Sequence, residues 1–231
     1  IAGFAVPTGG DPVYLDFDGN ERIGVTIEQA EISILQFVHL SGSFAFEKGP
    51  TYIVDVDTGI SSNLGAVLGN FGLDELADDI LNYGGMTVGE NFSSIGGLEV
   101  GSMTIGAANV DAFVGFGNPD FTQPLEGQDL YGFGIENFDL GMATFAPTIP
   151  IDALPSFTAI KASADSFTTH GFGDILNIDG YGITIRVNTG DAWPGNLGTP
   201  VIDFQSSFPA SASDEGIVGF KVPTGSDPLY L

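Results

Sequence analysis

Apolar and polar residues alternate with a period of two over most of the chain, which is the spacing of β-strands that have one face against a core. Residues 13–18 (VYLDFD) are an example, because their apolar and acidic side chains point to opposite sides of the expected strand. A tight turn at Gly19-Asn20 is followed by a second strand from Ile23. The apolar phase of this strand shifts by one residue after Gln29, which indicates a bulge or a bend.

The same alternation predicts further strands along the chain. Residues 41–49 and 51–59 are expected to be two strands with a Gly-Pro turn between them. From Met86 onward, Gly-rich turns recur about every 8 to 12 residues, as in a sandwich, a barrel or a solenoid. The clearest later strands are expected at 98–105, 110–116, 131–145, 157–167 and 181–187. Residues 194–200 and 209–216 have few structure signals and are expected to be connectors.

The period changes between Leu64 and Tyr83, where apolar residues recur at spacings of three and four. This spacing predicts one short helix over residues 73–82, ended by Gly84-Gly85. The fold class is therefore expected to be all-β: an elongated, multi-stranded antiparallel unit, like a sandwich or a solenoid, with one short helix. The pattern leaves the choice between sandwich and solenoid open.

A stretch at the start of the chain recurs at its end. Residues 1–15 read IAGFAVPTGGDPVYL and residues 217–231 read IVGFKVPTGSDPLYL, so that 11 of 15 positions are identical at an offset of 216. The four differences are Ala2/Val218, Ala5/Lys221, Gly10/Ser226 and Val13/Leu229. We interpret residues 1–216 as one unit of a tandem array and residues 217–231 as the first strand of the next unit. Residues 217–231 are expected to form the joint, packing on the neighbouring unit as residues 1–15 pack on the preceding one.

The composition adds a strong charge to this picture. The 231 residues include 30 acidic and 5 basic side chains, for a formal charge of −25, and no cysteine. Such a charge repels nucleic acids and anionic membranes, and the absence of cysteine excludes disulfides, thiolate zinc sites and a cysteine nucleophile. No apolar run is long enough to span a membrane as a helix. The charge is explained either by a solvated acidic coat or by carboxylates that bind Ca²⁺.

Four clusters of oxygen-bearing side chains are candidates for Ca²⁺ sites, because hard cations prefer closely spaced carboxylates and carbonyls. The first resembles the start of an EF-hand loop, but no acidic residue stands where the last ligand of that loop is expected. In the second, two carboxylates two residues apart share one strand face, about 7 Å from each other. A solvated acidic turn is the alternative for each cluster. The candidate metal ligands are Asp16, Asp18 and Asn20; Asp55 and Asp57; Asn118 and Asp120; and Asp174, Asn177 and Asp179.

Signals for catalysis are weak. The chain has no G-x-S-x-G, H-E-x-x-H or P-loop motif, and its only histidines are His39, in an apolar stretch, and His170, beside a turn glycine. With 30 acidic residues, pairs at glycosidase spacing arise by accident. The protein is therefore expected not to be an enzyme, with a glycosidase-like hydrolase as the remote alternative. Trp193, Tyr131 and Tyr181 are candidate stacking platforms for a carbohydrate-binding module.

Several segments of the chain resemble long tandem repeats of very large secreted or surface proteins of bacteria, often described as adhesin-like or calcium-binding. These segments are LSGSFAFEKG (40–49), TIGAANVDAFVGFG (104–117), 130–148, 157–190 and VIDFQSSFP (201–209). The resemblance implies an elongated extracellular all-β building block without catalytic residues. It does not extend to the calcium β-roll, because no G-G-x-G-x-D run is present.

The sequence therefore predicts a structural repeat of a giant extracellular or cell-surface protein, assembled end to end into a fibre or stalk and stabilised by Ca²⁺. Its expected partners are neighbouring copies of the same repeat and, in the alternative of a cell-surface adhesive or carbohydrate-binding module, surface glycans. Nucleic-acid binding and membrane insertion are not expected.

Overall fold

A computed structural model describes residues 3–61, 69–211 and 216–231. It is built mainly of antiparallel β-strands with two helices, which confirms the predicted all-β class. The strands are β1 (Phe4–Val6), β2 (Val13–Leu15), β3 (Ile23–Ile34), β4 (Val38–Asp57), β5 (Thr87–Val88), β6 (Ser94–Phe116), β7 (Tyr131–Pro147), β8 (Phe157–His170), β9 (Asp179–Gly190), β10 (Val201–Ile202), β11 (Lys221–Val222) and β12 (Leu229–Tyr230). The helices are α1 (Leu73–Tyr83) and α2 (Phe204–Ser207), with 3-10 turns at Glu90–Phe92, Gly173–Ile175 and Pro194–Asn196.

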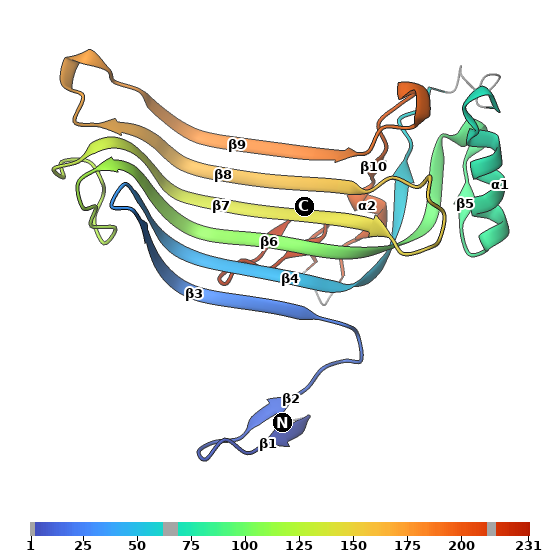
Figure 1. Ribbon diagram of the computed structural model, residues 1–231, viewed down its shortest axis with the longest axis horizontal. Coiled ribbons are helices and arrows are strands. Elements are labelled where there is room, and N and C mark those ends of the chain that lie inside the picture. The colour runs from blue at the N-terminus through green and yellow to red at the C-terminus, as the bar shows by residue number, and fades with distance from the viewer. Residues whose placement is uncertain (1–2, 62–68, 212–215) are drawn as a thin grey trace.

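One eight-stranded antiparallel sheet forms the body of the molecule. Its order is β10-β4-β6-β7-β8-β9, with β3 also pairing β4 and β5 also pairing β6. The long strands run side by side and bend near both ends, so that the sheet is curved (Figure 1). Two small hairpins stand apart from this sheet in the pairing, β1-β2 near the N-terminus and β11-β12 near the C-terminus. The sheet carries a second layer on one face, which includes α1 and the C-terminal hairpin, and this agrees with the sandwich-like alternative of the prediction.

The strands are longer than the sequence pattern indicated. The expected strands 41–49 and 51–59 are one continuous strand, β4, which ends at Asp57, and the predicted Gly-Pro turn at Gly49-Pro50 is wrong. Pro50 lacks a backbone donor, and the register of β4 against β6 shifts there without the chain turning back. The turn that does reverse the chain lies at Leu35 and Gln36, both with positive φ, and no glycine or asparagine marks it.

Bulges account for the other irregularities in the pattern. The predicted phase shift in the second strand is confirmed, because the pairing of β3 with β4 shifts between Ile27 and Ala30. The expected strands 98–105 and 110–116 are one strand, β6, interrupted by Asn109 with φ of 52°. The main-chain amide of Asn109 donates to Asp139 Oδ1 at 2.9 Å, which satisfies a donor that the bulge removes from the ladder.

The predicted helix over residues 73–82 is confirmed as α1, which buries Leu73, Leu76 and Ile80. Of the residues in the periodic pattern, Leu64 and Leu68 lie outside the described part. The second helix, α2, falls just before the expected connector 209–216 and was not predicted. Its N-cap is Asp203, whose side chain accepts hydrogen bonds from the amides of Gln205 and Ser206 at 3.0 and 3.2 Å.

The two faces of the sheet differ in what covers them. The main core fills the space between one face, α1 and the C-terminal segment, and it includes Phe145, Phe157, Trp193, Phe220 and Val222. On the opposite face, a row of apolar residues crosses six strands in register. Its members are Val25, Phe46, Ile105, Met142, Ile160 and Val187. Four of them are at least 38% exposed, so the described residues leave this face open to solvent.

Candidate functional site: a sheet face that docks the C-terminal hairpin

The C-terminal hairpin, residues 217–231, consists of two short antiparallel strands, β11 and β12, joined by a turn. Lys221 pairs with Tyr230 and Val222 with Leu229, and the main chains of Phe220 and Leu231 exchange two hydrogen bonds of 3.2 and 3.0 Å. The turn is closed by Thr224, whose hydroxyl donates to the carbonyl of Asp227 at 2.9 Å and accepts from the amide of Ser226 at 3.2 Å. The expected single strand is thus a hairpin.

A row of small residues on the covered side of the sheet makes room for this hairpin. Ala45, Gly106 and Gly141 are direct neighbours on β4, β6 and β7, and we call the surface around them the docking face. A Cβ at Gly106 would overlap the carbonyl oxygen of Pro223, and one at Gly141 would lie 3.2 Å from Leu229 Cβ. The hairpin therefore lies almost directly on the backbone of the sheet, which larger side chains would prevent.

Apolar anchors hold the hairpin on the docking face. Phe220 is only 4% exposed, with its ring centroid 5.0 Å from those of Phe145 and Phe208 and 5.1 Å from that of Tyr52. Val222 is completely buried. Burying two such side chains stabilises the docked hairpin by about 3–6 kcal/mol in total, at about 1.5–3 kcal/mol each. Because both belong to the main core, the hairpin completes that core.

Polar contacts add to this anchoring. Lys161 Nζ on β8 donates to the carbonyl oxygen of Tyr230 at 3.0 Å, and the amide of Gly219 donates to the carbonyl of Phe208 at 2.9 Å. At the turn, Asn109 Nδ2 donates to Ser226 Oγ at 3.4 Å. The two main-chain contacts do not depend on the side chains of the hairpin, so a related sequence could form them equally well.

The N-terminal hairpin, described over residues 3–15, has the same local structure. Phe4 pairs with Leu15 and Val6 with Val13, the register of the C-terminal hairpin shifted by 216 residues. The hydroxyl of Thr8 donates to the carbonyl of Asp11 at 2.8 Å, as Thr224 does to Asp227.

Its surroundings differ completely, because it extends away from the sheet beyond β3 (Figure 1). Phe4 is 72% exposed, against 4% for its counterpart Phe220.

The four proposed Ca²⁺ clusters lie in separate places, and several of their carboxylates accept hydrogen bonds from neighbouring protein donors. Asp18 Oδ1 accepts a hydrogen bond from the main-chain amide of Asn20 at 3.1 Å. This bond, together with one from the Asn20 side chain, lowers the pKa of Asp18 below its usual value. Asp120 accepts from the amide and hydroxyl of Thr122 and from Gln123, which lowers its pKa in the same way.

Asp55 and Asp57 do lie on the same side of β4, since the intervening Val56 is buried. Asp55 Oδ1 accepts the amide of Gly97 at 3.1 Å and Asp57 Oδ1 that of Gly59 at 2.8 Å, so both carboxylates are engaged. Asp174, Asn177 and Asp179 are all exposed around the start of β9. Within residues 3–61, 69–211 and 216–231, no three His, Asp or Glu side chains come close enough together to hold a metal ion. Ca²⁺ binding therefore stays a prediction.

The aromatic residues considered for carbohydrate stacking fall into two classes. Trp193 cannot be a surface platform, because it is 2% exposed and its indole N–H donates to the carbonyl of Thr58 at 2.8 Å within the core. Tyr131 and Tyr181 are exposed near the far end of the sheet, and Tyr131 lies against Phe172 with ring centroids 4.3 Å apart. The sequence pattern could not separate these cases, since all three residues follow glycine-rich or polar segments.

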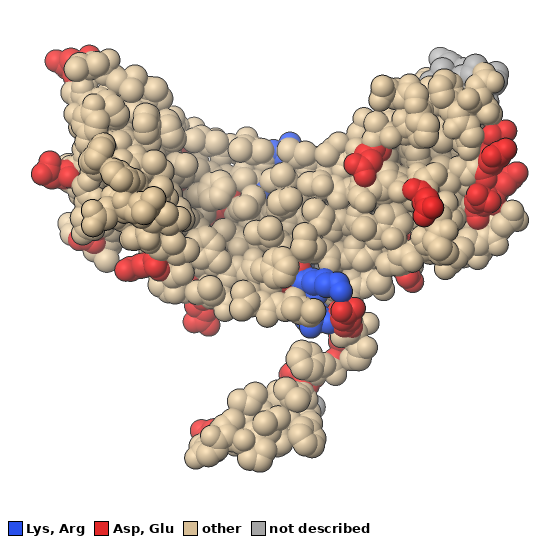
Figure 2. Space-filling view, viewed as in Figure 1, with Lys and Arg blue, Asp and Glu red and all other residues tan. Residues whose placement is uncertain are grey.

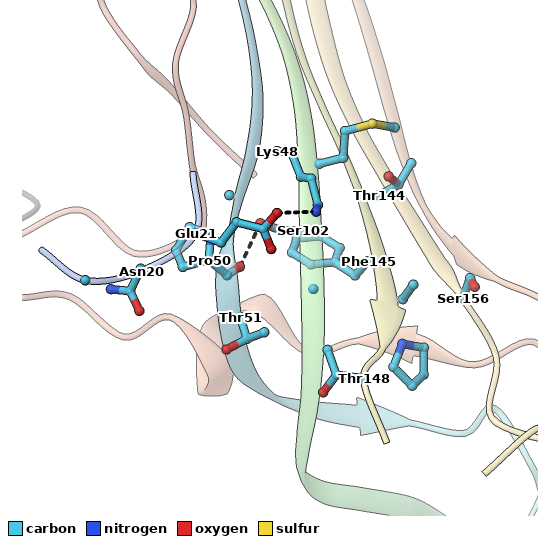
Figure 3. A pocket seen from close by; sticks show the side chains of 16 residues that line it. Asn20, Glu21, Lys48, Pro50, Thr51, Ser102, Thr144, Phe145, Thr148 and Ser156 are labelled. Atoms are coloured by element: carbon cyan, nitrogen blue, oxygen red, sulfur yellow. Dashed lines mark hydrogen bonds and ion pairs between the residues drawn. The ribbon is translucent and has the colours of Figure 1, made fainter. Parts of the chain in front are cut away.

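A cavity of about 690 Å³ lies beside the segment that joins β2 to β3 (Figure 3). At its rim, Lys48 Nζ contacts Glu21 Oε1 at 2.9 Å, and Ser102 Oγ donates to the carbonyl of Pro50 at 3.2 Å. Arg22 also approaches Glu47 at 3.6 Å. These ion pairs fix the end of the joining segment to β4, whereas Asp16 and Asp18 earlier in that segment remain exposed.

Comparisons with known proteins found no match: no family model, no curated protein and no solved structure is significantly similar to this chain. In the described part of the chain, no helix has the length and apolar character needed to cross a membrane.

Proposed function

We propose that the protein is a structural repeat unit of a large extracellular or cell-surface protein, and that successive units are joined through the terminal hairpins. In this arrangement, each unit ends in a docking face, and the first hairpin of the following unit occupies it. The segment 16–22 then connects the docked hairpin to the sheet of its own unit. The result is an end-to-end fibre or stalk.

The observation that supports this proposal is the pair of matching hairpins with opposite surroundings. Two hairpins whose sequences are identical at 11 of 15 positions pair in the same register, yet one completes a core and the other leaves its Phe 72% exposed. The exposed Phe4 and the half-buried Val6 on a preformed hairpin favour burial against an apolar partner. The docking face of another unit is a partner of the required shape, since it accommodates the homologous hairpin here.

The charge distribution is compatible with a role outside the cell and with repulsion between parallel fibres. The formal charge is −25, and acidic side chains lie mostly toward the ends and lower rim of the face shown in Figure 2. A joint made of apolar anchors and main-chain hydrogen bonds tolerates this repulsion, because no carboxylate belongs to the buried part of the hairpin.

Removing one hairpin at a time tests the proposal. A chain lacking residues 217–231 has an empty docking face and a free N-terminal hairpin, so copies should associate head to tail into open chains. Light scattering after size exclusion should show masses that rise with concentration, and electron microscopy should show filaments. A further chain lacking residues 1–15 as well should stay monomeric and lose about 3–6 kcal/mol of unfolding free energy, the value of the missing anchors.

The matched control removes the corresponding 15 residues, identical at 11 positions, from the other end. A chain lacking only residues 1–15 should be monomeric and as stable as the full chain within about 0.5 kcal/mol, because it loses no buried contact. If the chain lacking residues 217–231 is monomeric, the proposed end-to-end joint is wrong, whether its own N-terminal hairpin has folded back or the face has stayed empty.

The calcium prediction has its own test. Thermal melts of the full chain with Ca²⁺ and with EGTA, at fixed ionic strength, should differ if an ion binds only the folded state. A control with Mg²⁺ at the same concentration separates specific binding from general screening of the acidic surface. An unchanged melting temperature would remove Ca²⁺ from the proposal and leave the joint unaffected.

A further inference from the structure

Two of the five basic residues of this acidic chain lie side by side at the exit of the docked hairpin. Lys161 on β8 and Arg186 on β9 are direct cross-strand neighbours on the covered side of the sheet. Like charges in this position repel each other. Among the described residues, neither side chain forms an ion pair with a carboxylate, although Arg22 and Lys48 both do. The arrangement is therefore suited to an acidic partner.

An apolar cavity adjoins this pair. It has a volume of about 400 Å³, and its floor is formed by β8 and β9, with Ala159 and Asn188 beside the two basic residues. Its walls are Phe204 of α2 and Leu231, the last residue of the docked hairpin. If an extended chain continued past Leu231, the second following side chain would lie on the same side as Leu231, which lines this cavity.

In the N-terminal copy, the residues that follow the counterpart of Leu231 include both acidic side chains and a large apolar one. Leu15, the counterpart of Leu231, is followed by Asp16, Phe17 and Asp18. In extended backbone Phe17 points to the same side as Leu15, while the two acidic residues point to the other. All three are exposed here, and Phe17 is 71% exposed. Lys161 Nζ already donates to the carbonyl of Tyr230, the residue before Leu231.

We propose that Lys161, Arg186 and the adjacent cavity are a second binding site of the joint, which holds the segment Asp16-Phe17-Asp18 of the following unit. Phe17 occupies the cavity against Phe204, and the carboxylates of Asp16 and Asp18 neutralise the basic pair. This inference rests on the proposed function, since it assumes that the hairpin of one copy takes the place of residues 217–231 on another. It gives the joint a direction, because the connecting segment is bound as it leaves the docking face.

The test extends the full chain instead of assembling it. Five residues, Asp-Phe-Asp-Gly-Asn, the sequence of residues 16–20, are added after Leu231, and the melting temperature is compared with that of the unextended chain. We expect a rise of about 3–8 °C, because burying one Phe and pairing two charges stabilises a chain of this size by that order.

Two matched extensions divide this rise between the two contacts. Asp-Ala-Asp-Gly-Asn should lose most of it, because the cavity stays empty. Asn-Phe-Asn-Gly-Asn should lose the part of the rise in melting temperature that comes from the charge pairs, which is the part that added NaCl weakens. In a chain carrying Lys161→Gln and Arg186→Gln, compared with its own unextended form, the Asp and Asn extensions should raise the melting temperature equally.

The outcomes are decisive in each direction. No rise with Asp-Phe-Asp-Gly-Asn, or the same rise with the Ala version, overturns the inference. A rise that the double variant leaves unchanged overturns the role of the basic pair. None of these results bears on whether the hairpins join the units, because the extension is tested with residues 217–231 docked in their own chain.

Discussion

The two hairpins are identical at 11 of 15 positions but lie in different environments. In the C-terminal copy, Phe220 and Val222 complete the core between the sheet and α2, whereas in the N-terminal copy Phe4 remains in solvent. The pairing register and the threonine hydrogen bond at the turn are the same in both. Local sequence is thus sufficient for the shape of the hairpin, and burial depends on a docking face that only one copy reaches within this chain.

The comparison also shows which substitutions between the copies are tolerated. Lys221 replaces Ala5 at an exposed position, and Ser226 replaces Gly10 where its hydroxyl meets Asn109. The anchors, the turn threonine and the glycine that lies against Ile27 and Phe44, Gly225, are identical to their N-terminal counterparts. The residues that set the turn and the two apolar anchors are therefore the same in both copies.

The largest difference between the hairpins is expected when the anchor is removed. Phe220→Ala should lower the unfolding free energy by about 3–5 kcal/mol, because it leaves a cavity among three aromatic rings. Phe4→Ala should change it by less than about 0.5 kcal/mol. Urea denaturation of the two variants in parallel measures both values. Equal effects would mean that the N-terminal hairpin also packs in solution.

A substitution on the face itself should act next most strongly. Gly106→Ala places a methyl group against the carbonyl of Pro223 and should cost about 1–3 kcal/mol, as the hairpin is pushed outward. Gly101→Ala on the same strand is the control, because its nearest neighbour would be 3.7 Å away. Hydrogen exchange should show faster exchange of the Phe220 and Leu231 amides only in the Gly106 variant.

The turn threonines provide a smaller test. Thr224→Val keeps the shape but leaves the amide of Ser226 and the carbonyl of Asp227 without this partly buried partner, at a cost of about 1–2 kcal/mol. Thr8→Val removes the same bonds from an exposed turn, where water replaces them. Thr8→Val should not change the melting temperature of the full chain detectably. A comparable loss of stability in both variants would contradict the conclusion that only the C-terminal hairpin is docked.

The smallest effect is expected from the one charged difference between the copies. Lys221→Ala, which restores the residue of the N-terminal hairpin, should change the unfolding free energy by no more than about 0.5 kcal/mol, because the side chain is exposed. Chemical denaturation at two salt concentrations measures it. A large loss would show that this lysine distinguishes the two hairpins.

Much of the fold was predictable from local pattern. The bulge after Ile27 and the helix at Leu73–Tyr83 follow from shifts in the spacing of apolar residues, which depend on only a few neighbouring positions. The turn at Leu35-Gln36 and the continuity of β4 through Pro50 were not predictable. The turn accompanies the pairing of β3 with β4, and β4 stays continuous through Pro50 because it pairs with β6 on both sides of that residue.

The candidate site was predictable in part. The recurrence of residues 1–15 indicated a joint, but nothing in the strand of Gly106 or Gly141 marked these glycines as the floor of a docking face. They become neighbours only when β6 and β7 pair, and their small size has meaning only with the hairpin above them. Likewise, Lys161 and Arg186 are 25 residues apart in sequence and adjacent only through the register of β8 and β9.

By itself the sequence determined the elements whose causes are local: period-two strands, one helix, a bulge, and the recurrence of one terminal stretch, although not its hairpin form. Tertiary structure alone decided which hairpin is buried and which face of the sheet receives it. The physical reason is that alternation along a strand specifies two faces but does not say what covers either one. That depends on contacts between residues far apart in the chain, where the apolar area removed from water is fixed by shape as well as by residue type.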